Sequence, residues 1–184
     1  MTPQELHAAI DVVRGADLPR QAYAYSPGHD VRWTRPENFR PVTGKRRWVK
    51  PDPGTGFWTA TVTETTQDGR PLRTSWTEWC TAEEFGHYTG LIEVYPDPDA
   101  RVVRIDTLAD LHAVVAAYPT EPACHSALVY PDWVAMAADW DGVFLTEAGQ
   151  WRTRLPRGGG PDLYGWDCES VLWLQPTYRC GEAT

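Results

Sequence analysis

The chain has 184 residues, of which 42% are hydrophobic, enough for the core of one domain. Its formal net charge of −8 excludes passive capture of nucleic acid or of an anionic membrane, because phosphate contacts need clustered lysine and arginine. A local basic groove stays possible, and its candidates are Arg32, Arg35, Arg40 and the segment 45–50.

The first predicted element is an N-terminal helix. Residues 2–5 match a capping box with proline at the first helical position. Apolar residues then recur at helical spacing as far as Val13, and Gly15 is a typical stop. We therefore expect a single domain over residues 1–184, in which residues 1–19 form an N-terminal packing helix.

Three strands are predicted in the first third of the chain. Residues 20–25 alternate polar and apolar side chains, and residues 29–34 predict a short second strand. The stretch 57–63 has high β-propensity, and its alternation puts Trp58 and Thr59 on opposite faces.

The middle of the chain mixes helices with strands. Helices are predicted at residues 75–86, 107–118 and 131–140, and the first two show capping residues and apolar side chains at helical spacing. Residues 91–95 and 101–106 predict two strands joined by a proline-rich turn, which together favour a hairpin. Helices interleaved with many short strands indicate an α+β fold.

The stretch from Tyr164 to Leu174 joins a glycine-rich loop, residues 157–160, to a short apolar run that predicts a buried strand. Glu169 stands where loop becomes strand, a common place for a catalytic group on a rigid scaffold. The simpler interpretation of Asp167 and Glu169 is that they are solvated acids beside a strand.

The cysteines and histidines indicate no metal site. Four cysteines, at 80, 124, 168 and 180, lack zinc-ligand spacing and are expected to be reduced, although a thiol hydrolase using Cys80 or Cys168 stays open. The chain shows no dinucleotide, phosphate-loop or nucleophile-elbow motif. Because it shows no signal segment and no apolar run of membrane-spanning length, we expect a cytoplasmic protein without a membrane partner, or a toxin delivered by a signal-independent route.

Three short fragments occur in a suggestive order: Arg32-Trp33-Thr34, then residues 57–61, then Asp167-Cys168-Glu169. This order resembles the arginine, serine/threonine, glutamate arrangement of the ADP-ribosyltransferase superfamily, especially its small bacterial toxin-like members and the RNA 2′-phosphotransferases. The resemblance covers roughly residues 29 to 174, with short motifs. It implies split, mainly antiparallel sheets that clamp NAD+ in a cleft.

The resemblance also implies catalytic roles. Glu169 would stabilise the oxocarbenium-like state formed when the nicotinamide–ribose bond breaks. Arg32 would bind the diphosphate, and Thr59 would orient Glu169 or the ribose. The residues that the resemblance assigns to NAD+ binding are Arg32, Trp33, Thr34, Trp58, Thr59 and Tyr88, of which Trp33, Trp58 and Tyr88 are unranked candidates for stacking on nicotinamide.

In the superfamily, the loop before the catalytic glutamate often reads the target, and here it holds Tyr164, Trp166 and Asp167. Asp167 departs from the longer Gln or Glu of many relatives, and Trp-Thr-Ala-Thr departs from the usual second motif, so the acceptor, protein or nucleic acid, is left open. The expected function is NAD+-dependent transfer of ADP-ribose to a macromolecule. The alternative is a non-catalytic, tryptophan-rich protein- or glycan-binding module or immunity-type protein, since the chain has ten tryptophans.

Overall fold

The computed structural model describes residues 3–26, 28–43, 50–52, 54–88, 90–120, 128–156 and 160–182. Within these ranges the fold is α+β, as the sequence predicted, and its main sheet is a single, mainly antiparallel sheet of nine strands rather than two split sheets. Thr2 of the first capping box, the basic segment 45–47, the glycine-rich residues 157–159 and Cys124 lie outside the described residues.

The helices are short, and no helix of the described ranges has the length and apolarity needed to cross a membrane. They are α1(Pro3–Ala8), α2(Ser75–Ala82), α3(Leu108–Ala117), α4(Trp133–Met136) and α5(Glu147–Thr153), with 3-10 turns at η1(Gly15–Asp17), η2(Arg32–Thr34) and η3(Pro36–Asn38). The strands are β1(Val12–Arg14), β2(Gln21–Tyr25), β3(Phe57–Thr65), β4(Pro71–Thr74), β5(Gly90–Pro96), β6(Arg101–Ile105), β7(Leu128–Val129), β8(Gly142–Leu145), β9(Gly160–Pro161), β10(Ser170–Trp173) and β11(Tyr178–Cys180).

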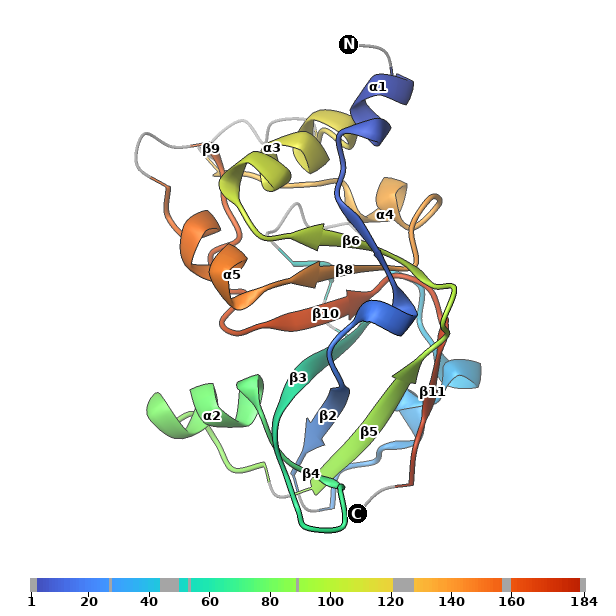
Figure 1. Cartoon of the computed structure of the whole chain (residues 1–184), viewed down its shortest axis with the longest axis vertical. Coiled ribbons are helices and arrows are strands. Elements are labelled where there is room, and N and C mark those ends of the chain that lie inside the picture. The colour runs from blue at the N-terminus through green and yellow to red at the C-terminus, as the bar shows by residue number, and fades with distance from the viewer. Residues whose placement is uncertain are drawn as a thin grey trace.

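The main sheet runs in the order β1-β6-β8-β10-β3-β2-β5-β11, with β4 paired to β3, and β6 and β8 are parallel. Figure 1 shows α1, α3, α4 and α5 around the β6–β8 end, whereas α2 lies beside the β2–β3–β5 end. Alternate residues of β10 enter two different apolar clusters, Leu172 the first and Val171 with Trp173 the second. This part of the sheet is therefore buried on both faces.

The sheet opens between β2 and β3. β3 pairs with β10 along four residues, Phe57 to Ala60. It pairs with β2 only at Ala60 and Thr61, although β2 continues against β5 for its full length. Beyond Ala22 the backbones of β2 and β3 therefore part, and side chains rather than a hydrogen-bond ladder line the space between them.

The predicted N-terminal helix over residues 1–19 is wrong in its second half. α1 ends at Ala8, and Val12–Arg14 forms β1, which pairs with β6. The chain is held against the turn before β6, because the Gly15 amide donates to the Ala100 carbonyl and a side chain at Gly15 would collide with the Asp97 carbonyl oxygen. Close backbone contact and β-branched residues thus override the helical spacing.

The predicted hairpin of residues 91–95 and 101–106 is also wrong. β5 pairs with β2 and β11, and β6 pairs with β1 and β8, so the two strands belong to opposite ends of the sheet. Each strand lies between two neighbours in the sheet, which bury more of it than a two-stranded hairpin could.

The predicted strand at residues 29–34 is instead a turn followed by η2. The Thr34 hydroxyl donates to the Val31 carbonyl and the Asn38 amide donates to the Arg32 carbonyl. Such local side-chain bonds satisfy the backbone without a strand partner. The strands predicted at 20–25 and 57–63 and the helix predicted at 107–118 are confirmed as β2, β3 and α3.

Candidate functional site

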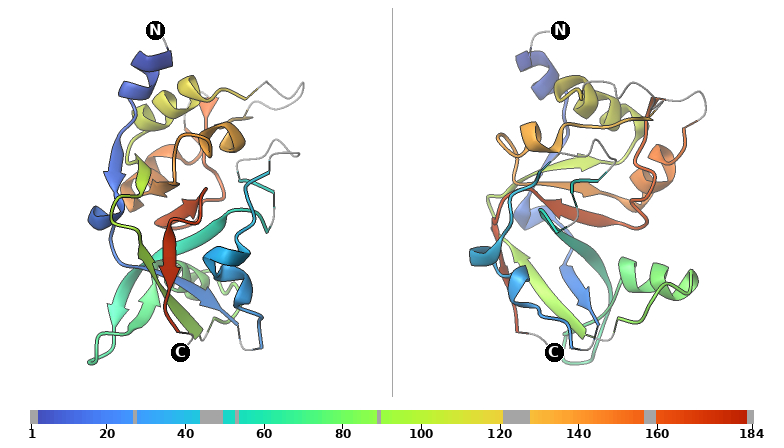
Figure 2. Two further views of the ribbon diagram at one scale, coloured as in Figure 1. Left: turned by 90° about the vertical axis from the view of Figure 1, so that its right-hand side faces the viewer. Right: turned by 180° about the vertical axis from the view of Figure 1, so that it is seen from behind.

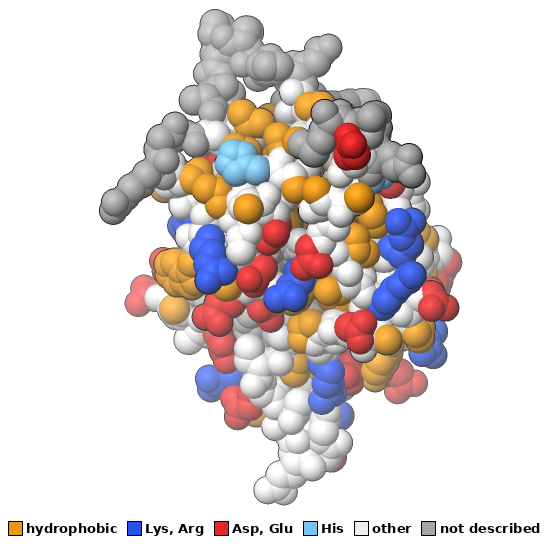
Figure 3. Space-filling view, turned by 45° about the horizontal axis from the view of Figure 1, so that its top comes forward, with side chains coloured by type: hydrophobic (Ala, Val, Ile, Leu, Met, Phe, Trp, Pro, Cys, Tyr) orange, Lys and Arg blue, Asp and Glu red, His pale blue; other side chains and the backbone are white. Residues whose placement is uncertain are grey.

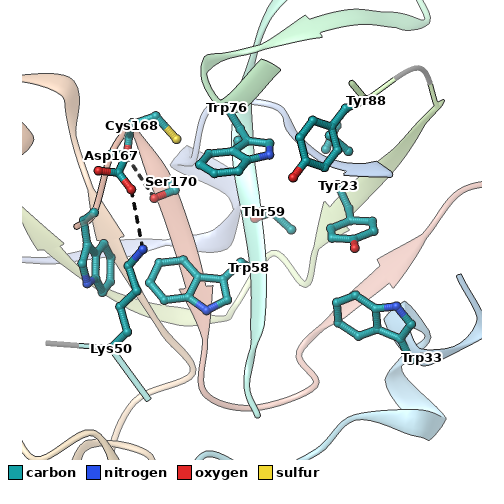
Figure 4. Close-up of a pocket in the computed structure, with 14 residues that line it drawn as sticks. Tyr23, Trp33, Lys50, Trp58, Thr59, Trp76, Tyr88, Asp167, Cys168 and Ser170 are labelled. Atoms are coloured by element: carbon teal, nitrogen blue, oxygen red, sulfur yellow. Dashed lines mark hydrogen bonds and ion pairs between the residues drawn. The ribbon is translucent and has the colours of Figure 1, made fainter. Parts of the chain in front are cut away.

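A cavity of about 320 Å³ lies where β2 and β3 part, and we call it the aromatic pocket (Figure 4). Its floor contains the small residues Ala22, Ala24 and Ala60, which leave room between the larger side chains of the walls. The remaining lining residues are Tyr23, Trp33, Lys50, Trp58, Thr59, Trp76, Tyr88, Trp166, Asp167, Cys168 and Ser170.

The aromatic walls are held by contacts with one another. Trp58 meets Trp166 edge to face, with ring centroids 4.5 Å apart, and Trp166 stacks on the buried Trp133. On the other side Tyr23 meets Trp33 edge to face at 5.1 Å. Rings packed in this way cannot turn freely, so the pocket presents pre-organised apolar surfaces to a ligand.

The charged groups of the pocket lie together at one side. Lys50 Nζ is 3.7 Å from Asp167 Oδ2 and 5.7 Å from the centroid of the Trp58 ring. The Asp167 side chain is only 18% exposed, and among the described lining residues it is the one carboxylate. Figure 4 shows this pair beside Trp58, facing Tyr23, Trp33 and Tyr88 across the hollow.

The thiols near the pocket are poor nucleophiles. Burial raises the pKa of Cys168 to about 12 and the pKa of Cys80 to about 11. Both groups therefore stay protonated near neutral pH, while thiol chemistry needs the thiolate. The Ser170 hydroxyl donates to the Cys168 carbonyl rather than to a base.

Arg32 lies on the surface rather than in the aromatic pocket. Its side chain is 85% exposed, and Nη2 is 2.8 Å from Oδ2 of Asp30. Hydrogen bonds from Arg32 hold the pKa of Asp30 at about 2. Of the two residues that follow it, Trp33 lines the pocket, whereas Thr34 is fully buried and does not line it.

The Thr59 hydroxyl is engaged inside the protein. It donates to Gln21 Oε1 at 2.9 Å and accepts from Trp173 Nε1 at 3.1 Å, and all three side chains are buried. Thr59 touches the pocket floor, but its hydroxyl orients core side chains and does not contact Glu169.

Glu169 points away from the aromatic pocket. Its carboxylate lies at a second cavity, lined also by Asp17, Arg104, Asp106 and Thr146, where Oε2 accepts from the Glu147 amide at 2.9 Å. Side chains alternate across the end of β10, so Glu169 faces the side opposite to Cys168 and Ser170. The predicted convergence of Arg32, Thr59 and Glu169 on one hollow is therefore wrong.

The predicted target-reading loop divides between surface and pocket. Tyr164 is 49% exposed, with its ring 5.1 Å from the Arg154 guanidinium, whereas Trp166 is 2% exposed. Gly165 between them has a φ of 93°, which favours glycine and lets the chain turn Trp166 inward. Asp167 then enters the pocket wall.

The sequence did not indicate that several residues of the aromatic pocket belong to a ligand site. Trp76 is spaced like a core residue of α2, Tyr23 is one residue of an alternating strand, and Lys50 belongs to a basic segment. Their joint position depends on the parting of β2 and β3, for which the sequence has no signal.

The first candidate for a local basic groove, Arg32 with Arg35 and Arg40, does not form one patch of free cations, and most of the second, Lys45-Arg46-Arg47, lies outside the described residues. Arg32 is paired with Asp30, and Arg35 donates to the Cys180 carbonyl. On the face shown in Figure 3, the coloured lysine and arginine side chains are interspersed with aspartate and glutamate rather than gathered in one patch. The same described ranges contain no group of three His, Cys, Asp or Glu residues arranged to hold a metal ion.

Comparison of the chain with protein-family models, with curated proteins and with solved structures finds no significant match.

Proposed function

We propose that the aromatic pocket binds the nicotinamide–ribose end of NAD+ and that the chain is an NAD+-dependent ADP-ribosyltransferase acting on a macromolecule. The observation that carries this proposal is the joining of aromatic walls with a carboxylate, Asp167, in one pocket. The nicotinamide ring of NAD+ is flat and positively charged, and aromatic faces with a nearby carboxylate favour such a ring.

The shape of the site supports the same ligand. A volume of about 320 Å³ is at the lower end of the range for small-molecule sites, so it suits one half of a dinucleotide. The parting of β2 and β3 leaves this cavity within one sheet, where the sequence resemblance implies split antiparallel sheets. A toxin-like role stays a prediction of that resemblance, and a cytoplasmic location stays a prediction from the sequence.

The catalytic roles move to other residues than those first expected. Loss of nicotinamide leaves positive charge on the ribose, and a carboxylate beside it lowers the energy of that state. Asp167 takes this role, and Lys50 holds its carboxylate and offers a cation to the diphosphate. Trp58, against which Lys50 lies, is the ring best placed to stack on nicotinamide.

The test measures NAD+ binding by quenching of tryptophan fluorescence, and transfer with labelled NAD+ and cell lysate. Asp167→Asn should lower transfer about 100-fold or more, and leave NAD+ affinity within a few-fold of wild type. Glu169→Gln and Arg32→Gln should behave like wild type, because both side chains lie outside the pocket. NADH, whose nicotinamide ring is neutral, should bind about tenfold more weakly than NAD+.

Two results would count against the proposal. If NAD+ neither quenches fluorescence nor raises the melting temperature, the pocket does not bind it. If Glu169→Gln abolishes transfer and Asp167→Asn does not, the reaction takes place in the other cavity.

The second candidate is the non-catalytic binding module. Four tryptophans, at 133, 140, 166 and 173, are buried and unavailable to a partner. The observation that favours a module is the half-exposed Phe85 at the end of a row of tryptophans on α2. A wild-type protein that binds a protein or glycan and does not turn over NAD+ would support this second candidate.

A further inference from the structure

α2 and the segment that follows it carry a row of aromatic rings that leads from the pocket to the surface. We call Trp76, Trp79, Phe85 and Tyr88 the α2 ridge. Trp76 and Trp79 are stacked with centroids 5.0 Å apart, and Phe85 lies 5.4 Å from Trp79 and 5.9 Å from Trp76. Phe85 is 53% exposed, so the row ends in solvent rather than in a core.

The position of α2 leaves this row accessible. Figures 1 and 2 both show α2 projecting from the side of the β2–β3–β5 end of the sheet, away from the other helices. The helix contacts the sheet through β3 and β4. Trp76 and Trp79 are therefore held on a helix that packs against the sheet, and Phe85, just after the helix, is open to a partner.

The charged side chains of the segment that carries the ridge are all acidic, whereas Arg70 and Arg73, which line a cavity with Tyr88, are paired with Asp68 and Glu64. Residues 75–90 contain three glutamates and no lysine or arginine. Glu78 accepts a hydrogen bond from the Thr63 hydroxyl. Glu83 and Glu84 are exposed and directly precede Phe85. A partner that covers the ridge must therefore bring positive charge to these two carboxylates.

Glu83 and Glu84 also destabilise the C-terminal end of α2. The Phe85 amide donates to the Cys80 carbonyl at 2.8 Å, which closes the helix with Glu84 in the position usually taken by glycine. Glu84 has a φ of 53°, a region that costs energy for a residue with a side chain. Negative charge is also unfavourable at a helix C-terminus. Local conflicts of this kind concentrate at functional sites.

We propose that the α2 ridge binds an arginine-bearing segment of a partner protein. A guanidinium group is planar and weakly hydrated, so it stacks on aromatic rings such as the exposed Phe85 and the half-buried Trp79 beside it. Its fork of donors also pairs with the carboxylates of Glu83 and Glu84. Nucleic acid and anionic membranes are repelled by the same carboxylates.

The ridge and the aromatic pocket share Trp76 and Tyr88, whose ring centroids are 5.8 Å apart. A segment bound on Phe85 and Trp79 therefore lies next to the pocket mouth. The surface is inferred from ring contacts and charge alone, so it stands whether or not NAD+ is the pocket's ligand.

The test is isothermal titration of the full chain with a peptide of alternating arginine and glycine at low salt. Glu83→Gln with Glu84→Gln should weaken binding about tenfold, because two charge-assisted contacts are lost. The matched control, Glu5→Gln with Glu37→Gln, removes the same charge from exposed positions on α1 and η3 and should leave affinity within about twofold. Added salt should weaken wild type more than the Glu83/Glu84 variant.

A second variant separates binding from folding. Glu84→Gly removes one carboxylate and relieves the backbone, so it should weaken the peptide while it raises the melting temperature. The proposal is overturned if the arginine peptide does not bind wild type, or if the Glu83/Glu84 and control variants bind alike. Equal binding of a lysine–glycine peptide would overturn the preference for arginine.

Discussion

Replacing Thr59 by valine tests whether its hydroxyl is structural or catalytic. Valine has nearly the same shape, so the change removes a hydroxyl and opens no cavity. In the structure this hydroxyl bridges Gln21 Oε1 and Trp173 Nε1, both buried. Thr59→Val therefore leaves Gln21 Oε1 without its donor and Trp173 Nε1 without its acceptor.

The cost follows from what the two neighbours can do. The Gln21 amide already donates through Nε2 to the Pro19 carbonyl and to the Thr61 hydroxyl, so it cannot rotate to find another donor for Oε1. Each buried polar group left unsatisfied costs about 1–3 kcal/mol, and we expect a loss of about 2–4 kcal/mol in the free energy of unfolding. For a chain of this length, the melting temperature should fall by about 5–15 °C.

Thr59→Ser is the matched control, because it keeps the hydroxyl and removes a buried methyl group. It should cost about 1 kcal/mol, less than Thr59→Val, although the valine variant buries more carbon. Thermal and urea melts of both variants give the comparison. If Thr59→Val is as stable as Thr59→Ser and loses only NAD+ turnover, the hydroxyl acts in chemistry and the structural interpretation is refuted.

Trp166→Ala should destabilise the fold by about 3–5 kcal/mol, whereas Tyr164→Ala should cost under about 1 kcal/mol, because only Trp166 is buried; equal losses in urea melts would contradict this. Glu84→Gly should raise the free energy of unfolding by about 1 kcal/mol, with no gain expected from Glu5→Gly, which lies within a helix. Burial raises the pKa of Cys168 to about 12, so the unfolded chain loses this thiol proton first as pH rises. The resulting stability is present below about pH 8.5 and falls as pH rises toward about 12. Cys168→Ser should therefore flatten the loss of melting temperature above about pH 9. Identical slopes of melting temperature against pH in the variant and wild type would contradict the raised pKa of Cys168.

Local patterns account for the elements that the sequence predicted well. The alternation and β-propensity of residues 57–63 predicted β3. Thr107 was predicted to cap the helix at 107–118, and in the structure it caps α3 through Asp110. Residues 29–34 failed because two side chains satisfy the backbone locally. Propensity and capping act within a few residues, so they can be judged without the rest of the chain.

The candidate site could be predicted only in pieces. Trp33, Trp58, Tyr88, Trp166 and Asp167 were named from the sequence, and all five line the aromatic pocket, whereas NAD+ binding stays a prediction. Glu169 was misplaced because it lies just before β10, where its carboxylate turns toward the amide of Glu147 and the second cavity. Arg32 was misplaced because it follows a turn rather than a strand.

By itself the sequence determined the α+β class, a strand at 57–63 and the aromatic character of the loop before β10, because periodicity, β-propensity and residue type are properties of short segments. Only the tertiary structure decided that β5 and β6 separate to opposite ends of the sheet, that β2 and β3 part after two pairs, and that Asp167 rather than Glu169 faces the hollow between them. Strand order and register depend on the burial that distant segments gain from one another, and that gain is summed over the whole fold.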